Sequence, residues 1–140
     1  MKIRPVAIVK ADFPDDSIED EFDIIQFPGR GIATALAEIL RRAGYVVTEP
    51  EHQHEHGWDF YADLGKRKFW FQAQVADDCY VHSAIQNWFS FRKINKQAYA
   101  AALATLNSGM KADPRFQEVL WYSKLTPPGE VGWRDPVVEG

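Results

Sequence analysis

Three histidines alternate with other residues over positions 52–56, and this is the pattern in the chain most typical of metal chemistry. In an extended segment, residues two apart point to the same side, about 7 Å from one another. Three imidazoles can bind zinc or copper, and catalytic zinc often combines three protein ligands with one open position. Three residues in a row do not readily surround one ion, however, and interleaved glutamates also fit a solvated loop. A metal-binding protein or metal-dependent enzyme is therefore the alternative interpretation, and we assign no metal and no cofactor. The alternative would use His52, His54 and His56.

The single cysteine, Cys79, would need a base and an orienting group within hydrogen-bond reach to act as a nucleophile. His82 lies three residues further along an expected strand, so the two side chains should face opposite sides. The preceding Asp77 and Asp78 disfavour a thiolate. No G-x-S-x-G motif is present. We therefore predict no catalytic residue and a protein that is not an enzyme.

A glycine-containing turn over residues 27–31 (FPGRG) precedes a helical pattern. Backbone N–H groups at a helix N-terminus attract phosphate. The turn matches neither the P-loop pattern nor the dinucleotide-binding pattern. It is more typical of a tight turn followed by close helix packing.

Residues 11–23 contain seven acidic residues and no basic one. Removing these seven from the total of 20 acidic residues leaves 13, against 16 basic residues, so an acidic segment is attached to a mildly basic body. Phe13, Ile18 and Phe22 interleave with the acids. A solvated loop would explain the charges alone, whereas apolar anchors within a charged rim are typical of protein recognition. The candidate partner-binding residues, which include an aromatic residue from another segment, are Asp15, Asp16, Glu19, Asp20, Glu21, Phe22, Asp23 and Trp70.

The composition limits the broad class of the protein. A chain of 140 residues with 46% hydrophobic and 14% aromatic residues has material for one folded domain with a core. A net charge of −4 argues against a general nucleic-acid binder. No apolar run is long enough to suggest a membrane span. The absence of a signal-peptide pattern at the N-terminus, together with one cysteine, leads us to expect a cytoplasmic location.

Hydrophobic periodicity predicts the order β-α-β-β-β-β-α-β. The expected helices cover residues 30–43 and 95–108, the second of them ended by Gly109. The expected strands cover residues 1–10, 45–48, 58–64, 69–75, 79–85 and 118–123. Short turns favour a mostly antiparallel sheet of about five or six strands, with both helices on one face. We thus expect a single α+β domain over residues 1–124, with an acidic loop at 11–23 and an irregular tail at 125–140.

Aromatic residues exceed what one core should hold. Tyr61, Trp70 and one aromatic residue of the final strand are expected on the sheet face away from the helices, and the aromatic cluster at residues 88–91 is also hard to bury. Such a face marks either a partner surface or the cover formed by the C-terminal tail. Isologous dimerisation through this face is a further possibility.

Three stretches between residues 29 and 75 resemble a group of small bacterial α+β proteins. They are Gly31-Ile32-Ala33-Thr34-Ala35-Leu36, Gly44-Tyr45-Val46-Val47-Thr48-Glu49-Pro50 and His56-Gly57-Trp58-Asp59-Phe60. Proteins of this group accompany secreted polymorphic toxins as immunity proteins. The resemblance implies a protein that binds a cognate toxin and blocks its active site. Members share no universal binding residues, so the resemblance implies no particular site.

The leading hypothesis is a non-enzymatic cytoplasmic protein that neutralises a partner protein, namely a toxin domain with a basic cleft. It depends on the acidic segment with its apolar residues, the surplus aromatic residues and the lack of a catalytic constellation. The alternatives are the histidine-based metal protein and a structural or adaptor subunit of a larger complex. We expect neither a nucleic-acid partner nor a membrane.

Overall fold

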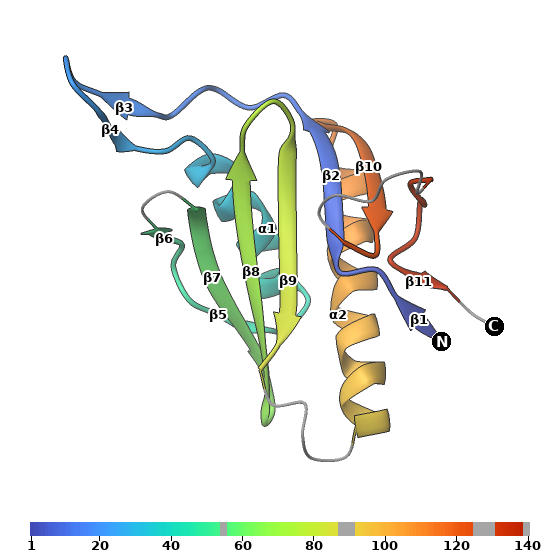
Figure 1. Ribbon diagram of the computed structural model, residues 1–140. Helices are drawn as coiled ribbons and strands as arrows, with labels where there is room; N and C mark the ends of the chain where they lie inside the picture. The colour runs from blue at the N-terminus through green and yellow to red at the C-terminus, as the bar shows by residue number, and fades with distance from the viewer. Residues whose placement is uncertain (54–55, 87–91, 125–130, 139–140) are drawn as a thin grey trace.

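A seven-stranded sheet forms the centre of the protein. The structure, a computed structural model, describes residues 1–53, 56–86, 92–124 and 131–138, with only the backbone described at 92–94 (Figure 1). The strand order is β10-β2-β9-β8-β7-β5, β6 also pairs with β7, and neighbouring strands are antiparallel. The strands are β2 (Val6–Ala11), β5 (Val46–Val47), β6 (Glu51–Gln53), β7 (Gly57–Leu64), β8 (Arg67–Val75), β9 (Cys79–Ile85) and β10 (Phe116–Tyr122).

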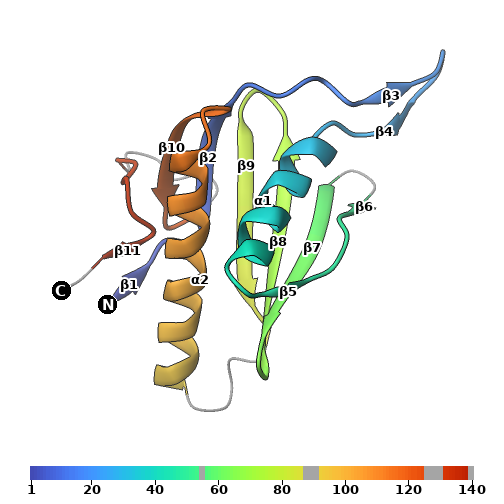
Figure 2. The same ribbon diagram turned by 180° about the vertical axis from the view of Figure 1, so that it is seen from behind.

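Both helices cover the same face of this sheet, behind it in Figure 1 and in front of it in Figure 2. Helix α1 (Arg30–Arg42) buries one side of its surface, including Leu36 and Leu40, and ends before Gly44, which has a φ of 98°. Its bounds agree with the prediction to within one residue. The α+β class, the mostly antiparallel sheet and the placement of both helices on one face are confirmed.

Helix α2 (Arg92–Ala112) extends beyond both predicted ends. Gly109 was expected to end it, but the helix continues for three more residues. The reason is the packing of the two helices: a Cβ atom at Gly109 would collide with the side chain of Ile39 on α1. Glycine thus serves close helix–helix approach here, and Met110 beyond it is fully buried.

The core lies between the sheet and the helices. Alternate residues of the long strands point into it, including Phe60, Phe69, Phe71 and Trp121, while their neighbours point to the open face. The indole Nε1 of Trp121 donates to Asn107 Oδ1 at 2.9 Å, so the buried N–H has a partner on α2. The alternation of apolar and polar residues that predicted these strands therefore also predicts which side of each strand is buried.

Two small ribbons lie outside the central sheet. Strand β3 (Ile18–Glu19) pairs with β4 (Ile24–Gln26), so the segment expected to be an acidic loop contains a hairpin. Strand β1 (Lys2–Ile3) pairs with β11 (Val137–Val138), so the segment expected to be an irregular tail contains a strand. The strand expected over residues 1–10 is thus divided into β1 and β2, which pair in different sheets, whereas β3, β4 and β11 are too short to give a periodic pattern.

The described part of the tail follows the edge of the sheet. Trp121 and Trp133 exchange backbone hydrogen bonds of 2.7 and 3.0 Å, which places Trp133 beside β10. Tyr122 lies against Gly132, and the Arg4 guanidinium lies 4.2 Å from the Trp133 ring centroid. Of the expected tail, residues 125–130 and 139–140 lie outside the described residues, as does the aromatic cluster at 88–91.

Neither helix is both long enough and apolar enough to cross a membrane, judged over the residues that the structure describes.

Candidate partner-binding site

The β3–β4 hairpin projects from the body of the protein, and we call residues 18–26 the arm (Figures 1 and 2). Phe22, at its tip, is 91% exposed. Ile18 and Ile25 are 49% and 53% exposed, so apolar surface continues along both strands. The acidic residues of the arm are all exposed; they are Glu19, Asp20, Glu21 and Asp23.

The tip of the arm has a defined turn. The Asp20 carboxylate accepts hydrogen bonds from the backbone N–H groups of Phe22 and Asp23, at 2.9 and 2.8 Å. These bonds favour the charged carboxylate and lower the pKa of Asp20 below its ordinary value. Side-chain to backbone bonds of this kind are typical of aspartate in turns. The turn presents Phe22 to solvent.

Asp16 holds the first end of the arm against α1. Its two carboxylate oxygens accept hydrogen bonds from the N–H groups of Gly29 and Gly31, each at 2.8 Å. The first turn of α1 contains no acidic residue of its own, so Asp16 supplies both the acceptors and the negative charge that a helix N-terminus favours. Gln26, on the returning strand, donates to the Asp16 carbonyl at 2.8 Å. Asp16 thus has a structural role, and it differs from the acidic residues of the arm in that its partners lie at the start of α1.

The second end of the arm is held to the body by the contacts of Phe27 with His52 and Trp58. The Phe27 N–H donates to His52 Nε2 at 2.9 Å, and Trp58 Nε1 donates to the Phe27 carbonyl at 2.9 Å. The Phe27 and His52 rings stack with centroids 5.9 Å apart. The arm is therefore fixed to the body at both ends.

The histidine alternative gains no support from these contacts. His52 uses Nε2 to accept the Phe27 N–H, while His56 is exposed and His54 lies outside the described residues. Within the described part of the chain, no group of three or more His, Cys, Asp or Glu residues could hold a metal ion.

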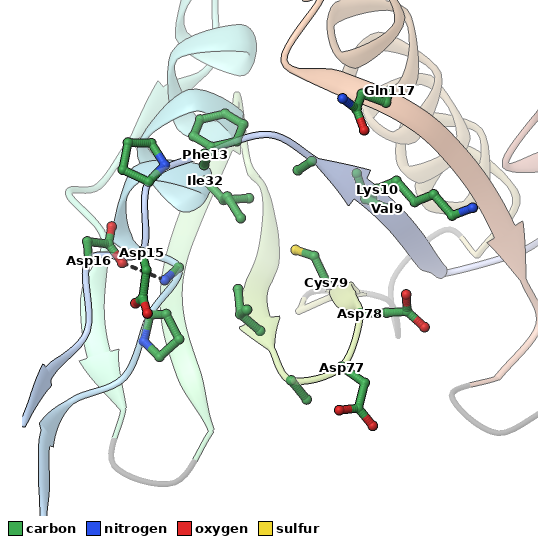
Figure 3. A pocket seen from close by; sticks show the side chains of 16 residues that line it. Val9, Lys10, Phe13, Asp15, Asp16, Ile32, Asp77, Asp78, Cys79 and Gln117 are labelled. Carbon is green, nitrogen blue, oxygen red and sulfur yellow. Dashed lines mark hydrogen bonds between the residues drawn. The ribbon is translucent and has the colours of Figure 1, made fainter.

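A groove of about 560 Å³ opens beside the base of the arm (Figure 3). One side is formed by the segment between β2 and β3 together with the N-terminus of α1, and the other by the turn between β8 and β9. Its apolar lining includes Val9, Phe13, Ile32 and Val75. Its acidic lining consists of Asp15, Asp16, Asp77 and Asp78. We call this feature the acidic groove.

Cys79 lies in the floor of the acidic groove and is 6% exposed. Burial, with a further contribution from the charge of Asp78, raises the pKa of its thiol to about 12. A thiol with this pKa is not a nucleophile at neutral pH. His82 points to the opposite face, where its ring nitrogen Nε2 lies 3.1 Å from Gln74 Oε1. The structure therefore does not pair Cys79 with His82.

Trp70 lies on the open face of the sheet, apart from the arm. Its indole Nε1 donates to Asp59 Oδ2 at 2.9 Å, and Gln72 Nε2 donates to Asp59 Oδ1 at 2.6 Å. Tyr61 is directly opposite Trp70 across the β7–β8 pair. Alternation placed Trp70 and Tyr61 on this face as expected, but these contacts give Trp70 no link to the acidic candidates.

The structure thus divides the candidate residues into three groups. Five lie on the arm, Asp15 lies on the rim of the acidic groove, and Asp16 and Trp70 have separate intramolecular partners. Sequence reasoning missed Ile24 and Ile25, which follow the acidic segment and add exposed apolar surface to the arm. The sequence feature that could have identified them is the pair of adjacent isoleucines directly after the acidic segment.

Comparison of the chain with protein-family models, with curated proteins and with solved structures gave no match.

Proposed function

We propose that this protein binds and neutralises another protein, as a cytoplasmic immunity protein does for its cognate toxin, and that the arm is the main contact. The observation that carries the proposal is Phe22, 91% exposed at the tip of a projecting hairpin among exposed carboxylates. The partner presents an apolar pocket for this ring within a basic cleft.

The energetic argument starts with the apolar side chains. Moving a fully exposed phenylalanine into an apolar pocket contributes roughly 1.5–3 kcal/mol. Aromatic anchors of this kind dominate many interfaces, because most other contacts are close to neutral. Ile18 and Ile25 flank the tip and extend the surface that a pocket could cover.

The charges of the arm add specificity and speed. The arm contains four acidic residues and no basic one. Exposed charges of one sign attract a partner of opposite sign and raise the association rate constant, and this effect weakens as salt is added. A basic cleft is the partner surface that such an arm fits.

Fixing the arm at both ends favours tight binding. Asp16 secures the strand that enters the arm and His52 secures the segment that leaves it. A segment that is already ordered loses less conformational entropy when it binds. The arm can therefore use its exposed side chains for affinity.

The test begins with tagged protein retained with its stoichiometric partner from the native host, followed by binding kinetics with the purified partner. We expect Phe22→Ser to weaken binding at least tenfold, mainly through faster dissociation. The matched control is Val46→Ser, because Val46 is 75% exposed on β5, away from the arm. Equal affinity of Phe22→Ser and Val46→Ser would refute the proposed role of the arm.

Charge is tested separately with Glu19→Lys/Glu21→Lys. This variant should associate more slowly, and its association rate should lose its salt dependence. Glu51→Lys changes the charge at the exposed residue of β6 and serves as the control. Retention of only further copies of the chain would instead favour a homodimer, and retention within a large assembly would favour an adaptor subunit.

A further inference from the structure

The acidic groove brings carboxylates that have no cationic partner in the described part of the chain to face one another across one cavity. Among the described residues, Asp15, Asp77 and Asp78 form no ion pair within 4.0 Å. Figure 3 shows Asp15 on one side of the groove and the two other aspartates on the turn opposite. Unpaired negative charge thus lies on both rims of one cavity.

Several carboxylates of the body, in contrast, have cationic neighbours. Glu38 lies 2.9 Å from Arg41 and 3.2 Å from Arg42, and Asp113 lies 2.7 Å from Arg115. Lys10, the cationic residue that lines the groove, instead lies 3.9 Å from Glu118 on the neighbouring strand. Among the described residues, no basic side chain therefore forms an ion pair with Asp15, Asp77 or Asp78.

The floor of the groove adds an apolar surface and one buried polar atom. Val9, Phe13, Ile32 and Val75 supply hydrocarbon. The Cys79 side chain is more than nine-tenths buried, its thiol makes no hydrogen bond to the other described residues, and it lines the cavity (Figure 3). A thiol sulfur is a weak acceptor and suits an N–H donor. A ligand that lies along the groove can rest an aliphatic stem on the hydrocarbon of the floor and place the N–H groups of a cationic head between the thiol and the carboxylates of a rim.

We propose that the acidic groove receives a lysine or arginine side chain of the same protein that the arm engages. This inference rests on the proposed function. The source is a protein because the groove continues directly into the arm: Asp15 on its rim is only three residues before β3. A partner that covers the arm therefore passes over the groove, and the basic cleft inferred from the arm supplies the cation.

The size of the groove agrees with this occupant. A volume of about 560 Å³ lies within the range of roughly 300–1,000 Å³ typical of ligand pockets, so the side chain and its flanking backbone fit. Ion pairs at a solvated rim contribute modestly, so removing both charges of the β8–β9 turn should weaken binding about tenfold.

The first experiment uses the full chain alone, with agmatine, a four-carbon stem with a guanidinium at one end and an ammonium at the other, as the probe. Titration followed by NMR should give saturable amide shift changes at Val9, Ile32 and Val75. Asp77→Asn/Asp78→Asn should weaken this binding at least fivefold. Glu49→Gln/Glu51→Gln makes the same change in net charge elsewhere and should have no effect. Phe22→Ser should also leave agmatine binding unchanged.

Three results would overturn the groove assignment in this experiment. They are no saturable shift at the lining residues, equal binding to Asp77→Asn/Asp78→Asn, and equal binding of N-butylacetamide, an uncharged molecule with the same stem. Each result concerns the groove alone and leaves the arm untested.

The second experiment uses the purified partner. Asp77→Asn/Asp78→Asn should weaken partner binding about tenfold, and saturating agmatine should weaken wild-type binding by a similar factor. If agmatine binds but does not compete, the occupant is a free cation and the proposal fails. If Phe22→Ser has no effect while the groove variant weakens binding, the role of the arm fails and the groove assignment stands.

Discussion

The carboxylate of Asp16 lies 2.8 Å from the backbone nitrogen of Gly31, so a residue of the acidic segment closes the first turn of a helix that begins fourteen positions later in the chain. Gly29, with a φ of 115°, turns its own N–H toward the same carboxylate. The left-handed conformation is one that glycine adopts without strain. One side chain thus couples the order of the arm to the order of the helix.

Replacement of Asp16 by alanine should lower the free energy of unfolding by about 1–2 kcal/mol, because two N–H groups at the helix start lose their acceptor. Urea unfolding followed by circular dichroism measures this change. Asp12→Ala is the control, since Asp12 is exposed in the same segment. Equal stability of the two variants would mean that water replaces Asp16 without cost.

The turn at the arm tip should depend on pH through Asp20. The folded-state pKa of Asp20 is lowered by the N–H groups of Phe22 and Asp23, so the turn gains stability from the charged carboxylate. This gain is fully present at pH values above the ordinary pKa of 3.8 and is lost as pH falls through the lower folded-state pKa. NMR shifts of the Phe22 amide should report the loss, and Asp20→Asn should remove its pH dependence. A wild-type titration identical to that of the variant would contradict this assignment.

Cys79 should resist alkylation while the protein is folded. Its pKa of about 12, against an ordinary 9.0, lowers the thiolate fraction at pH 8 by roughly a thousandfold. Iodoacetamide followed by mass spectrometry should label the protein in guanidinium chloride and leave the native protein unmodified over the same time. Asp78→Asn should raise the native rate slightly, because Asp78 contributes to the pKa shift. Rapid native labelling would show that the groove floor opens to solvent.

His52 should behave as a structural residue. Its Nε2 accepts the Phe27 N–H, and a metal ion at this atom would displace that bond. Equilibrium dialysis against zinc, nickel and copper should show no stoichiometric binding that His52→Ala removes. The same variant should be less stable than wild type by about 1 kcal/mol, the typical contribution of a hydrogen bond. Stoichiometric metal lost on His52→Ala would restore the histidine alternative.

Gly109→Ala tests the approach of the two helices. Alanine should gain about 1 kcal/mol of helix propensity, but overpacking against Ile39 should cost about 1–3 kcal/mol. We expect net destabilisation, measured by urea unfolding. Ile39→Ala should reverse it, because the colliding atoms belong to the Ile39 side chain. Additive effects of the two substitutions would contradict the packing argument.

Local pattern explains which parts of the fold could be predicted. Helix α1 and strands β7 to β9 follow periodic apolar spacing, and their connections are short, so the sequence predicts both type and neighbours. The β1–β11 pair joins chain segments at opposite ends of the sequence. Strands of two or three residues contain too few residues for a period to be recognised, so β3, β4 and β11 could not be predicted, and the expected strand over residues 1–10 gave no sign that β1 would pair apart from β2.

The candidate site likewise has features that the sequence predicts and features that it does not. Composition identified the acidic segment as exposed, since charged residues seldom lie in a core, and Phe22 became a candidate because it stands among these acids. It could not separate Asp16 from Asp15, because the donors for Asp16 come from Gly29 and Gly31, remote in sequence. His52 was identified by its spacing, whereas its role depends on Phe27, twenty-five residues away. Residue type indicates which chemistry is possible, and long-range contacts decide which chemistry is used.

The arm also has a consequence for solubility. Among the described strands, β3 and β4 pair only with each other, so each has an outer edge to which another chain could add a strand. Exposed isoleucines beside such an edge favour aggregation, whereas the acidic residues between them make the arms of two molecules repel. Repulsion of this kind is screened within about 10 Å at 0.1 M salt and disappears when carboxylates are protonated. The carboxylates that would attract a basic partner therefore also act as gatekeepers that keep free copies of the protein apart.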